Sequence, residues 1–326
     1  MISTTLKISA SANGKKAKKE NGVELQVPDQ VTKGRLPILK TYKMYVGGAF
    51  PRTESGRYYI PVNGQGDKLA NVCLGSRKDF REAVVVARGA LSGWNERAAF
   101  NRGQILYRIA EMLEGRKAQF IDELIKQGST TEEAKREVDL SIDRLIYYAG
   151  WCDKFQQLNS TVNPVASSHF NFSVPEATGV VSIIAPQGTS LLGLVSVVAP
   201  VIAGGNTCIV LASFVKPLCA VTFGEVVNSS DVPGGVVNIL TGKVSELAPY
   251  LADHMDVNAI IFCEGDKETK KMLQEKASLN LKRVVFYDKI DWITKDGESP
   301  YIIMDTQEIK TTWHPIEKIA GAKSGY

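Results

Sequence analysis

The feature that most constrains the fold is an alternation of apolar runs and helical stretches between about residues 172 and 290. Five runs rich in Val, Ile and Leu are separated by four stretches with helical spacing. Near-continuous apolar runs indicate strands that are covered on both faces, which is typical of a parallel sheet. The segment is therefore predicted to be a doubly wound, Rossmann-like α/β domain. The runs are GVVSIIAP, NTCIVLA, GGVVNILTG, VNAIIF and LKRVVF.

Helices are predicted before this core and extended chain after it. Apolar residues recur at helical spacing over about residues 77–91, 98–127 and 131–158, and Gly115 is expected to bend the second helix. Thr130 and Glu133 have the spacing of a capping box at the start of the third helix. After the core, residues of about 299–315 are predicted to form one or two strands that end at Pro315.

Charge and cysteine usage restrict the class of protein. Residues 1–35 hold seven of the 39 basic residues against three acidic ones, and the remaining 32 basic and 32 acidic residues balance. We expect a disordered basic tail over 1–35, one domain over 36–326, and no groove for nucleic acid. No apolar run is long enough for a membrane span. The five cysteines lack metal-ligand spacing, so we expect no metal site and a cytoplasmic location.

Several segments resemble aldehyde dehydrogenases in the correct order. The stretch GVVSIIAPQGTSLLGLVSVVAPVIAGGNTCIVLAS, followed by VPGGVVNILTG, is similar to the cofactor-binding half of that family. The resemblance extends over about residues 41–286. It is strongest to the shortened, Cys-less second copy of two-part aldehyde dehydrogenases. Members of the family oxidise aldehydes with NAD or NADP, using a Cys nucleophile, a Glu base and an Asn oxyanion donor.

Two of the family's motifs are altered where the resemblance places the oxyanion donor and the cofactor ribose. The family's Pro-Trp-Asn motif is Pro186-Gln187-Gly188 here, so the amide donor is replaced by Gly188. Loss of one such donor typically lowers the rate by about 10²–10³. The Lys and Glu that hold the ribose correspond to Leu211 and Phe214. Neither side chain can hydrogen-bond a hydroxyl, so we expect both to pack against apolar neighbours.

The remaining chemical positions are altered as well. Glu264 and Asp266 flank Gly265 where the family's Gly approaches the pyrophosphate, so two acids oppose an anionic ligand. They can also interact with the helix dipole there. Tyr287 takes the place of the Glu base and is a poor base at neutral pH. No Cys follows Cys263, and we expect the chain to be too short for a full catalytic domain.

These departures predict no catalytic residue and no bound cofactor. If the family's cofactor cleft still binds a ligand in this chain, that ligand is expected to be NAD or NADP. The preferred interpretation is a non-catalytic protein that forms homo-oligomers or hetero-oligomers with a catalytic aldehyde dehydrogenase. Two alternatives stay open, namely a weak or altered NAD(P)-dependent oxidoreductase and a small-molecule sensor that uses the old cleft. The segment Tyr301–His314 is the candidate for reaching a neighbouring subunit, unless it folds back on its own chain.

Overall fold

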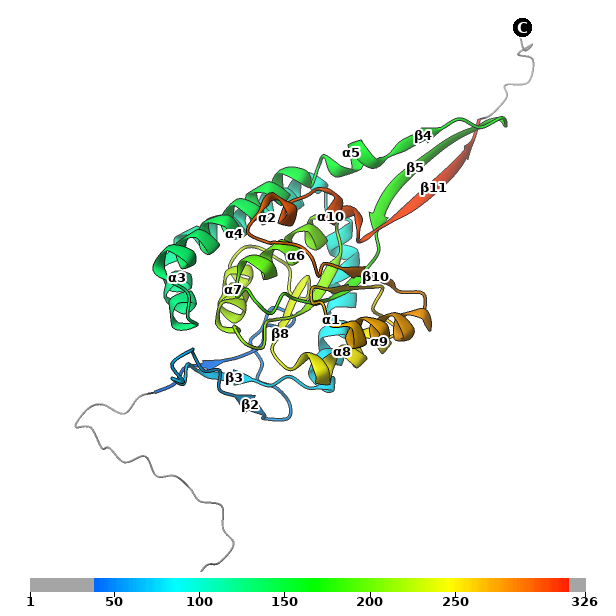
Figure 1. Ribbon diagram of the computed structural model, residues 1–326. Coiled ribbons are helices and arrows are strands. Elements are labelled where there is room, and N and C mark those ends of the chain that lie inside the picture. The colour runs from blue at the N-terminus through cyan, green and yellow to red at the C-terminus, as the bar shows by residue number, and fades with distance from the viewer. Residues whose placement is uncertain (1–37, 317–326) are drawn as a thin grey trace, which may run out of the picture. The chain divides into compact units, whose positions relative to one another are not determined.

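The described part of the chain is built around a five-stranded parallel sheet. The computed structural model describes residues 38–316, so the predicted tail at 1–35 lies outside the described residues. The strand order β10-β9-β6-β7-β8 places the first strand of the predicted alternation at the centre. Figure 1 shows this sheet with helices packed around it. The predicted doubly wound sheet is confirmed. Its strands are β6 (Val180–Ile184), β7 (Thr207–Leu211), β8 (Val237–Leu240), β9 (Ala259–Phe262) and β10 (Arg283–Phe286).

Helices cover both faces of this sheet. The α-helices are α1 (Arg77–Asn95), α2 (Ala99–Gly115), α3 (Lys117–Lys126), α4 (Thr131–Trp151), α5 (Phe155–Asn159), α6 (Leu192–Ala203), α7 (Leu218–Asn228), α8 (Val244–Asp253), α9 (Lys267–Ser278) and α10 (Tyr301–Met304). A short 3₁₀ turn covers Lys295–Gly297. No helix within 38–316 is long and apolar enough to cross a membrane.

The alternation of side chains along the strands separates two cores. Val181 and Ile183 of β6 pack with α2, α3, α4, α6 and α7. Val180 and Ile184 of the same strand pack with α1, α8 and α9. Successive residues of a strand point to opposite faces, so the two cores lie on opposite sides of the sheet. Continuous apolar strands are therefore needed, which is the pattern that the sequence carries.

The N-terminal helices begin and end at recognisable signals. The predicted capping box at Thr130 and Glu133 is present, and a second one joins Ser76 and Asp79 at the start of α1. The predicted helix over 98–127 is divided into α2 and α3 beside Gly115, as expected. The predicted helix over 131–158 is wrong at its C-terminal end, because α4 ends at Trp151 and α5 begins only at Phe155.

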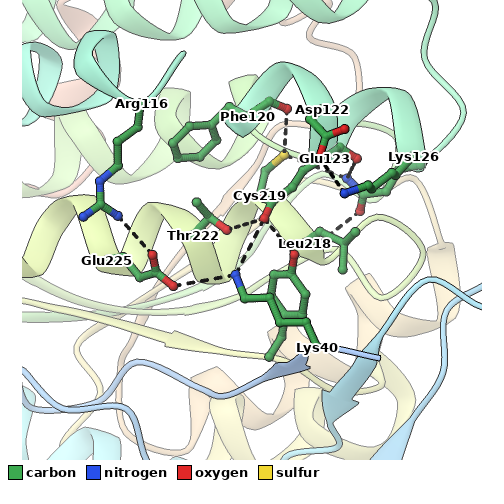
Figure 2. A network of polar contacts seen from close by, with 12 residues as sticks. Lys40, Arg116, Phe120, Asp122, Glu123, Lys126, Leu218, Cys219, Thr222 and Glu225 are labelled. Carbon is green, nitrogen blue, oxygen red and sulfur yellow. Dashed lines mark hydrogen bonds and ion pairs between the residues drawn. The ribbon is translucent and has the colours of Figure 1, made fainter. Parts of the chain in front are cut away.

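A small sheet near the start of the described residues is tied to the helices by a buried carboxylate. The sheet has the order β1-β3-β2, with β1 at Thr41–Tyr42, β2 at Tyr58–Tyr59 and β3 at Asn71–Cys73. Glu123 of α3 accepts hydrogen bonds from the hydroxyls of Tyr42 and Thr222, both at 2.7 Å. Figure 2 shows this network, in which Lys40 lies between Glu123 and Glu225. The contacts join β1 to α3 and α7.

A third sheet holds the C-terminal strand. Its order is β11-β5-β4, with β4 at Thr161–Asn163, β5 at His169–Ala177 and β11 at Gln307–Pro315. β11 pairs antiparallel with β5 of its own chain along its whole length. The predicted strand end at Pro315 is confirmed, and so is the alternative in which the segment folds back. The prediction of extended chain across Tyr301–His314 is wrong at its start, because residues 301–304 form α10 with Ile302 and Ile303 buried.

Candidate functional site

The positions of the predicted cleft lie along one edge of the parallel sheet. Pro186 and Gly188 follow β6, Leu211 ends β7, and Phe214 comes three residues later. Glu264 and Gly265 follow β9, and Tyr287 follows β10. Because these four strands are neighbours and parallel, their carboxyl ends share one edge. Ligands of doubly wound sheets bind at such an edge, so the structure brings the predicted positions to the place where a cofactor would be held.

Gln187 connects the loops that follow β6, β7 and β9. Its backbone N–H donates to Oε1 of Glu264 at 2.7 Å, and its carbonyl accepts from the hydroxyl of Ser213 at 2.8 Å. Its side-chain Oε1 accepts the backbone N–H of Phe214 at 2.8 Å, while Nε2 donates to the carbonyl of Ala185 at 2.9 Å. The loops are thereby joined to one another through the protein's own groups. Gln187 was not among the predicted site residues, although it stands between Pro186 and Gly188.

The apolar residues at the ribose position are packed, as the sequence predicted. Leu211 is 1% exposed and belongs to the core beneath α1, α8 and α9. The ring of Phe214 stacks on the ring of Tyr59 with centroids 4.4 Å apart and an interplanar angle of 18°. Burial raises the pKa of Tyr59, whose hydroxyl has no hydrogen-bond partner within residues 38–316. These two positions offer no polar atom of a side chain to a sugar hydroxyl.

The two acids at the pyrophosphate position act differently from each other. Asp266 is the N-cap of α9. It accepts hydrogen bonds from the hydroxyl of Thr269 and from its backbone N–H, the latter at 2.9 Å, and these bonds lower the pKa of its carboxyl. The sequence also predicts that Glu264 interacts with the dipole of α9. In the structure, its carboxylate instead accepts the backbone N–H of Gln187. A Cβ added at Gly265 would meet open space, so close packing does not require glycine there.

The N-terminus of α6 is also occupied by a side chain of the chain itself. Oε1 of Glu137, on α4, accepts the backbone N–H groups of Ser190, Leu191 and Leu192 at 3.2, 2.8 and 3.2 Å. A helix N-terminus otherwise attracts an anion. Sequence reasoning missed Glu137, because its target lies 53 to 55 residues away and no local spacing signals the contact.

The residue at the base position is buried and bonded. The Tyr287 hydroxyl donates to Oδ2 of Asp305 at 2.5 Å, and its ring lies edge-to-face against Trp292. Burial raises the pKa of Tyr287 far above its ordinary range, and the nearby Asp305 carboxyl raises it further. Burial also raises the pKa of Cys263 well above that of an ordinary thiol, with Glu264 adding to the effect. A protonated phenol and a protonated thiol are poor as base and nucleophile at neutral pH.

Comparisons with known proteins identify the family. The model of the aldehyde dehydrogenase family matches residues 52–321. The chain belongs to the aldehyde dehydrogenase family. It is 31% identical over 297 residues to the cytosolic 10-formyltetrahydrofolate dehydrogenase of Mus musculus, covering 89% of this chain and 32% of that protein. It is 30% identical to the D-glyceraldehyde dehydrogenase (NADP(+)) of Thermoplasma acidophilum, covering 80% of this chain and 51% of that protein.

Solved structures of aldehyde dehydrogenases have the same fold. A putative aldehyde dehydrogenase from Burkholderia cenocepacia superposes with a TM-score of 0.72 and 26% identity, covering 76% of this chain and half of that one. The NAD⁺ complex of an aldehyde dehydrogenase from Bacillus cereus gives the same TM-score at 24% identity. The chain thus spans about a third of the length of 10-formyltetrahydrofolate dehydrogenases and half of these solved chains.

The residues at the sheet edge do not fit the dinucleotide that the family uses. A dinucleotide needs polar partners for its ribose and close, uncharged backbone for its pyrophosphate. Here Leu211 is buried, Phe214 is stacked on Tyr59, and Glu264 places a carboxylate beside the loop after β6. The described residues also contain no group of three or more His, Cys, Asp or Glu that could hold a metal ion.

Proposed function

We propose that this chain is a non-catalytic member of the aldehyde dehydrogenase family that acts as an assembly partner of a catalytic aldehyde dehydrogenase. The observation that carries the proposal is the set of contacts at the sheet edge. Gln187 joins three loops there, and Phe214 is stacked where the family holds a ribose. Tyr287 replaces the base and is itself bonded to Asp305. The residues at the ribose and base positions thus lack the family's polar groups and make contacts within the chain instead.

The alternatives from the sequence, a weak oxidoreductase and a sensor, both need an open cleft. The hydrogen bonds of Gln187 and the capping of α6 and α9 by Glu137 and Asp266 count against such a cleft. All five cysteines are buried and unpaired, which supports the expected reducing, cytoplasmic location.

The sheet β11-β5-β4 is the surface that we assign to assembly. β11 pairs only with β5 in the described part of the chain, so its other edge presents unpaired backbone groups. Proteins usually cover or pair such an edge, and a strand from a partner would do so. Ile309 and Trp313 lie four residues apart, on the same face of β11, and each is 56% exposed. Their burial against a partner would add an apolar contact to the main-chain hydrogen bonds.

The test is light scattering of the full chain, alone and after co-expression with an aldehyde dehydrogenase of the same organism. The wild-type chain is expected to form a homo-oligomer or a complex with that enzyme. Trp313→Glu should weaken the association at least tenfold, because it places a charge in the apolar contact. Tyr107→Glu is the matched control, since Tyr107 is 57% exposed on α2, away from β11. The proposal is contradicted if the wild-type chain stays monomeric and forms no complex with the enzyme.

A further inference from the structure

Two adjoining hollows lie between α1 and α8, away from the cleft positions. Both are lined by Arg77 and Tyr250. One, of about 280 Å³, continues along α1 to Phe80 and Arg81 and is closed by His254 and Met255 beyond the end of α8. The other, of about 450 Å³, continues to Arg57 and the first turn of α8. Together they form a groove, which we call the α1–α8 groove.

The charges that line the α1–α8 groove leave an excess of cations. Arg77 and Arg81 are exposed, and neither has a carboxylate within ion-pair distance among the described residues. The acids nearby are already engaged. Glu246 pairs with Arg57 at 3.0 Å, and Asp253 lies 3.8 Å from Lys276. Two arginines therefore face the groove without a neutralising partner.

The placement of these two arginines runs against the local charge preferences of a helix. Arg77 is the first residue of the helix and Arg81 follows four residues later, on the same side. Like charges at this spacing destabilise a helix by about 0.2–0.5 kcal/mol, and cations near a helix N-terminus oppose its dipole. Violations of local preference concentrate at functional sites. A bound anion would convert both unfavourable contributions into favourable ones.

His254 adds a hydrogen-bond donor at the inner end of the groove. Nδ1 of His254 accepts the backbone N–H of Asp256 at 3.2 Å, so the neutral ring carries its proton on Nε2 and can donate it. Burial lowers the pKa of His254. The cations Lys282, Arg81 and Arg88 lower it further and together oppose the effect of Asp256.

An aromatic surface accompanies the cations. The guanidinium of Arg77 lies over the ring of Tyr250, 5.1 Å from its centroid, and Tyr250 is 38% exposed. The buried ring of Phe80 contacts His254 edge-to-face at 5.9 Å, and Met255 is 77% exposed at the rim. A planar ligand could thus stack on Tyr250 or on the Arg77 guanidinium while an attached anion reaches Arg81.

We infer that the α1–α8 groove binds a small phosphate monoester carried on a planar ring, with Arg77, Arg81 and His254 facing the phosphate and Tyr250 facing the ring. Phosphate suits this set because guanidinium groups bind its oxygens through two parallel hydrogen bonds. The ring distinguishes the expected ligand from free phosphate. This inference is independent of the proposed assembly role, since none of its residues belongs to β11 or to the cleft.

The test is calorimetric titration of the full chain with phenyl phosphate, inorganic phosphate and phenol. Phenyl phosphate should bind saturably and about tenfold more tightly than inorganic phosphate, and phenol should not bind. Arg77→Ala and Arg81→Ala should each weaken binding at least tenfold, as expected for the loss of a charge-assisted hydrogen bond. In an NMR titration, phenyl phosphate should raise the pKa of His254. The signal of His254 is assigned as the histidine signal that is missing from the His254→Gln variant.

Arg108→Ala is the matched control, because Arg108 is a half-exposed arginine on α2 that pairs with Glu111 at 2.8 Å and does not line the groove. It should bind phenyl phosphate as tightly as the wild type. The inference is overturned if phenyl phosphate does not bind saturably, or if Arg108→Ala weakens binding as much as Arg77→Ala does. Equal affinity for inorganic phosphate would overturn the assignment of Tyr250 to the ring.

Discussion

The backbone N–H of Gln187 donates to Oε1 of Glu264 across 2.7 Å, which joins the loop after β6 to the loop after β9. The same glutamine accepts the N–H of Phe214, next to the end of β7. In a doubly wound sheet these loops surround the ligand. Here they also bind each other through groups of the chain itself.

Gln187→Ala should lower the free energy of unfolding by about 1–2 kcal/mol, because it removes the side chain's bonds to Phe214 and Ala185. The measurement is urea unfolding followed by circular dichroism. Gln157→Ala is the control, since Gln157 makes one exposed bond to the carbonyl of Asp153. If both variants unfold at the same urea concentration, Gln187 does not hold the loops together.

Glu137→Ala should destabilise the protein by about 1–2 kcal/mol, the usual effect of losing a helix N-cap. The reason is that three backbone N–H groups at the start of α6 lose their acceptor. Glu137→Gln should lose less, because its amide oxygen can still accept. Thermal unfolding of both variants is compared with that of Glu82→Ala, an exposed position on α1. A melting temperature of Glu137→Ala equal to that of Glu82→Ala would refute the capping role.

Glu123 should make stability fall as the pH rises. Burial raises the pKa of its carboxyl, partly offset by the hydrogen bonds from Tyr42 and Thr222. The folded state therefore binds the proton more tightly than the unfolded state. Linkage then requires stability to be lost as the pH rises from the ordinary range of a carboxyl, about pH 4, through the raised pKa.

The measurement is the free energy of unfolding of the wild type and Glu123→Gln between pH 4 and pH 8. The neutral amide can accept the same two hydroxyl bonds, so the variant should lose less stability across this range. Glu111→Gln, at an exposed carboxylate that pairs with Arg108 on α2, is the control. A decline with pH that is identical in the wild type and Glu123→Gln would show that this carboxyl does not titrate as described.

The sequence predicted the central part of the fold well, because each signal there is local and strong. The five apolar runs became β6 to β10, since strands covered on both faces bury most of their side chains and are therefore rich in apolar residues. Thr130 and Glu133 formed their capping box because the contact spans three residues. The C-terminal segment was less predictable. Residues 301–304 look extended by composition, but burial of Ile302 and Ile303 favours the short α10.

Sequence reasoning placed the candidate positions at the carboxyl edge of the sheet but revealed only part of their contacts. Resemblance to the family identified Leu211, Phe214 and Tyr287, and packing of the apolar pair followed from their chemistry. The partners of these residues come from elsewhere in the chain. Tyr59 lies in β2 and Asp305 follows α10, so only the tertiary structure brings them to the edge. Long-range partners of this kind have no spacing by which a single sequence reveals them.

NAD and NADP should not bind saturably below about 1 mM, which corresponds to about 4 kcal/mol of binding free energy. The reason is that Leu211 and Phe214 cannot bond a ribose and that Glu264 repels a pyrophosphate. Calorimetry of the full chain tests this, with a catalytic aldehyde dehydrogenase as the positive control. A micromolar dissociation constant for either nucleotide would support the oxidoreductase or sensor alternatives.

The most direct test of the proposal that the chain is non-catalytic measures NADH or NADPH formation by the purified chain with short aliphatic and aromatic aldehydes. We expect no rate above background, because Gly188 and Tyr287 replace the oxyanion donor and the base, and burial keeps Cys263 protonated. Cys263→Ala should therefore behave as the wild type does. Aldehyde-dependent turnover by the wild type would show that the chain is catalytic, and its loss in Cys263→Ala would identify Cys263 as the nucleophile.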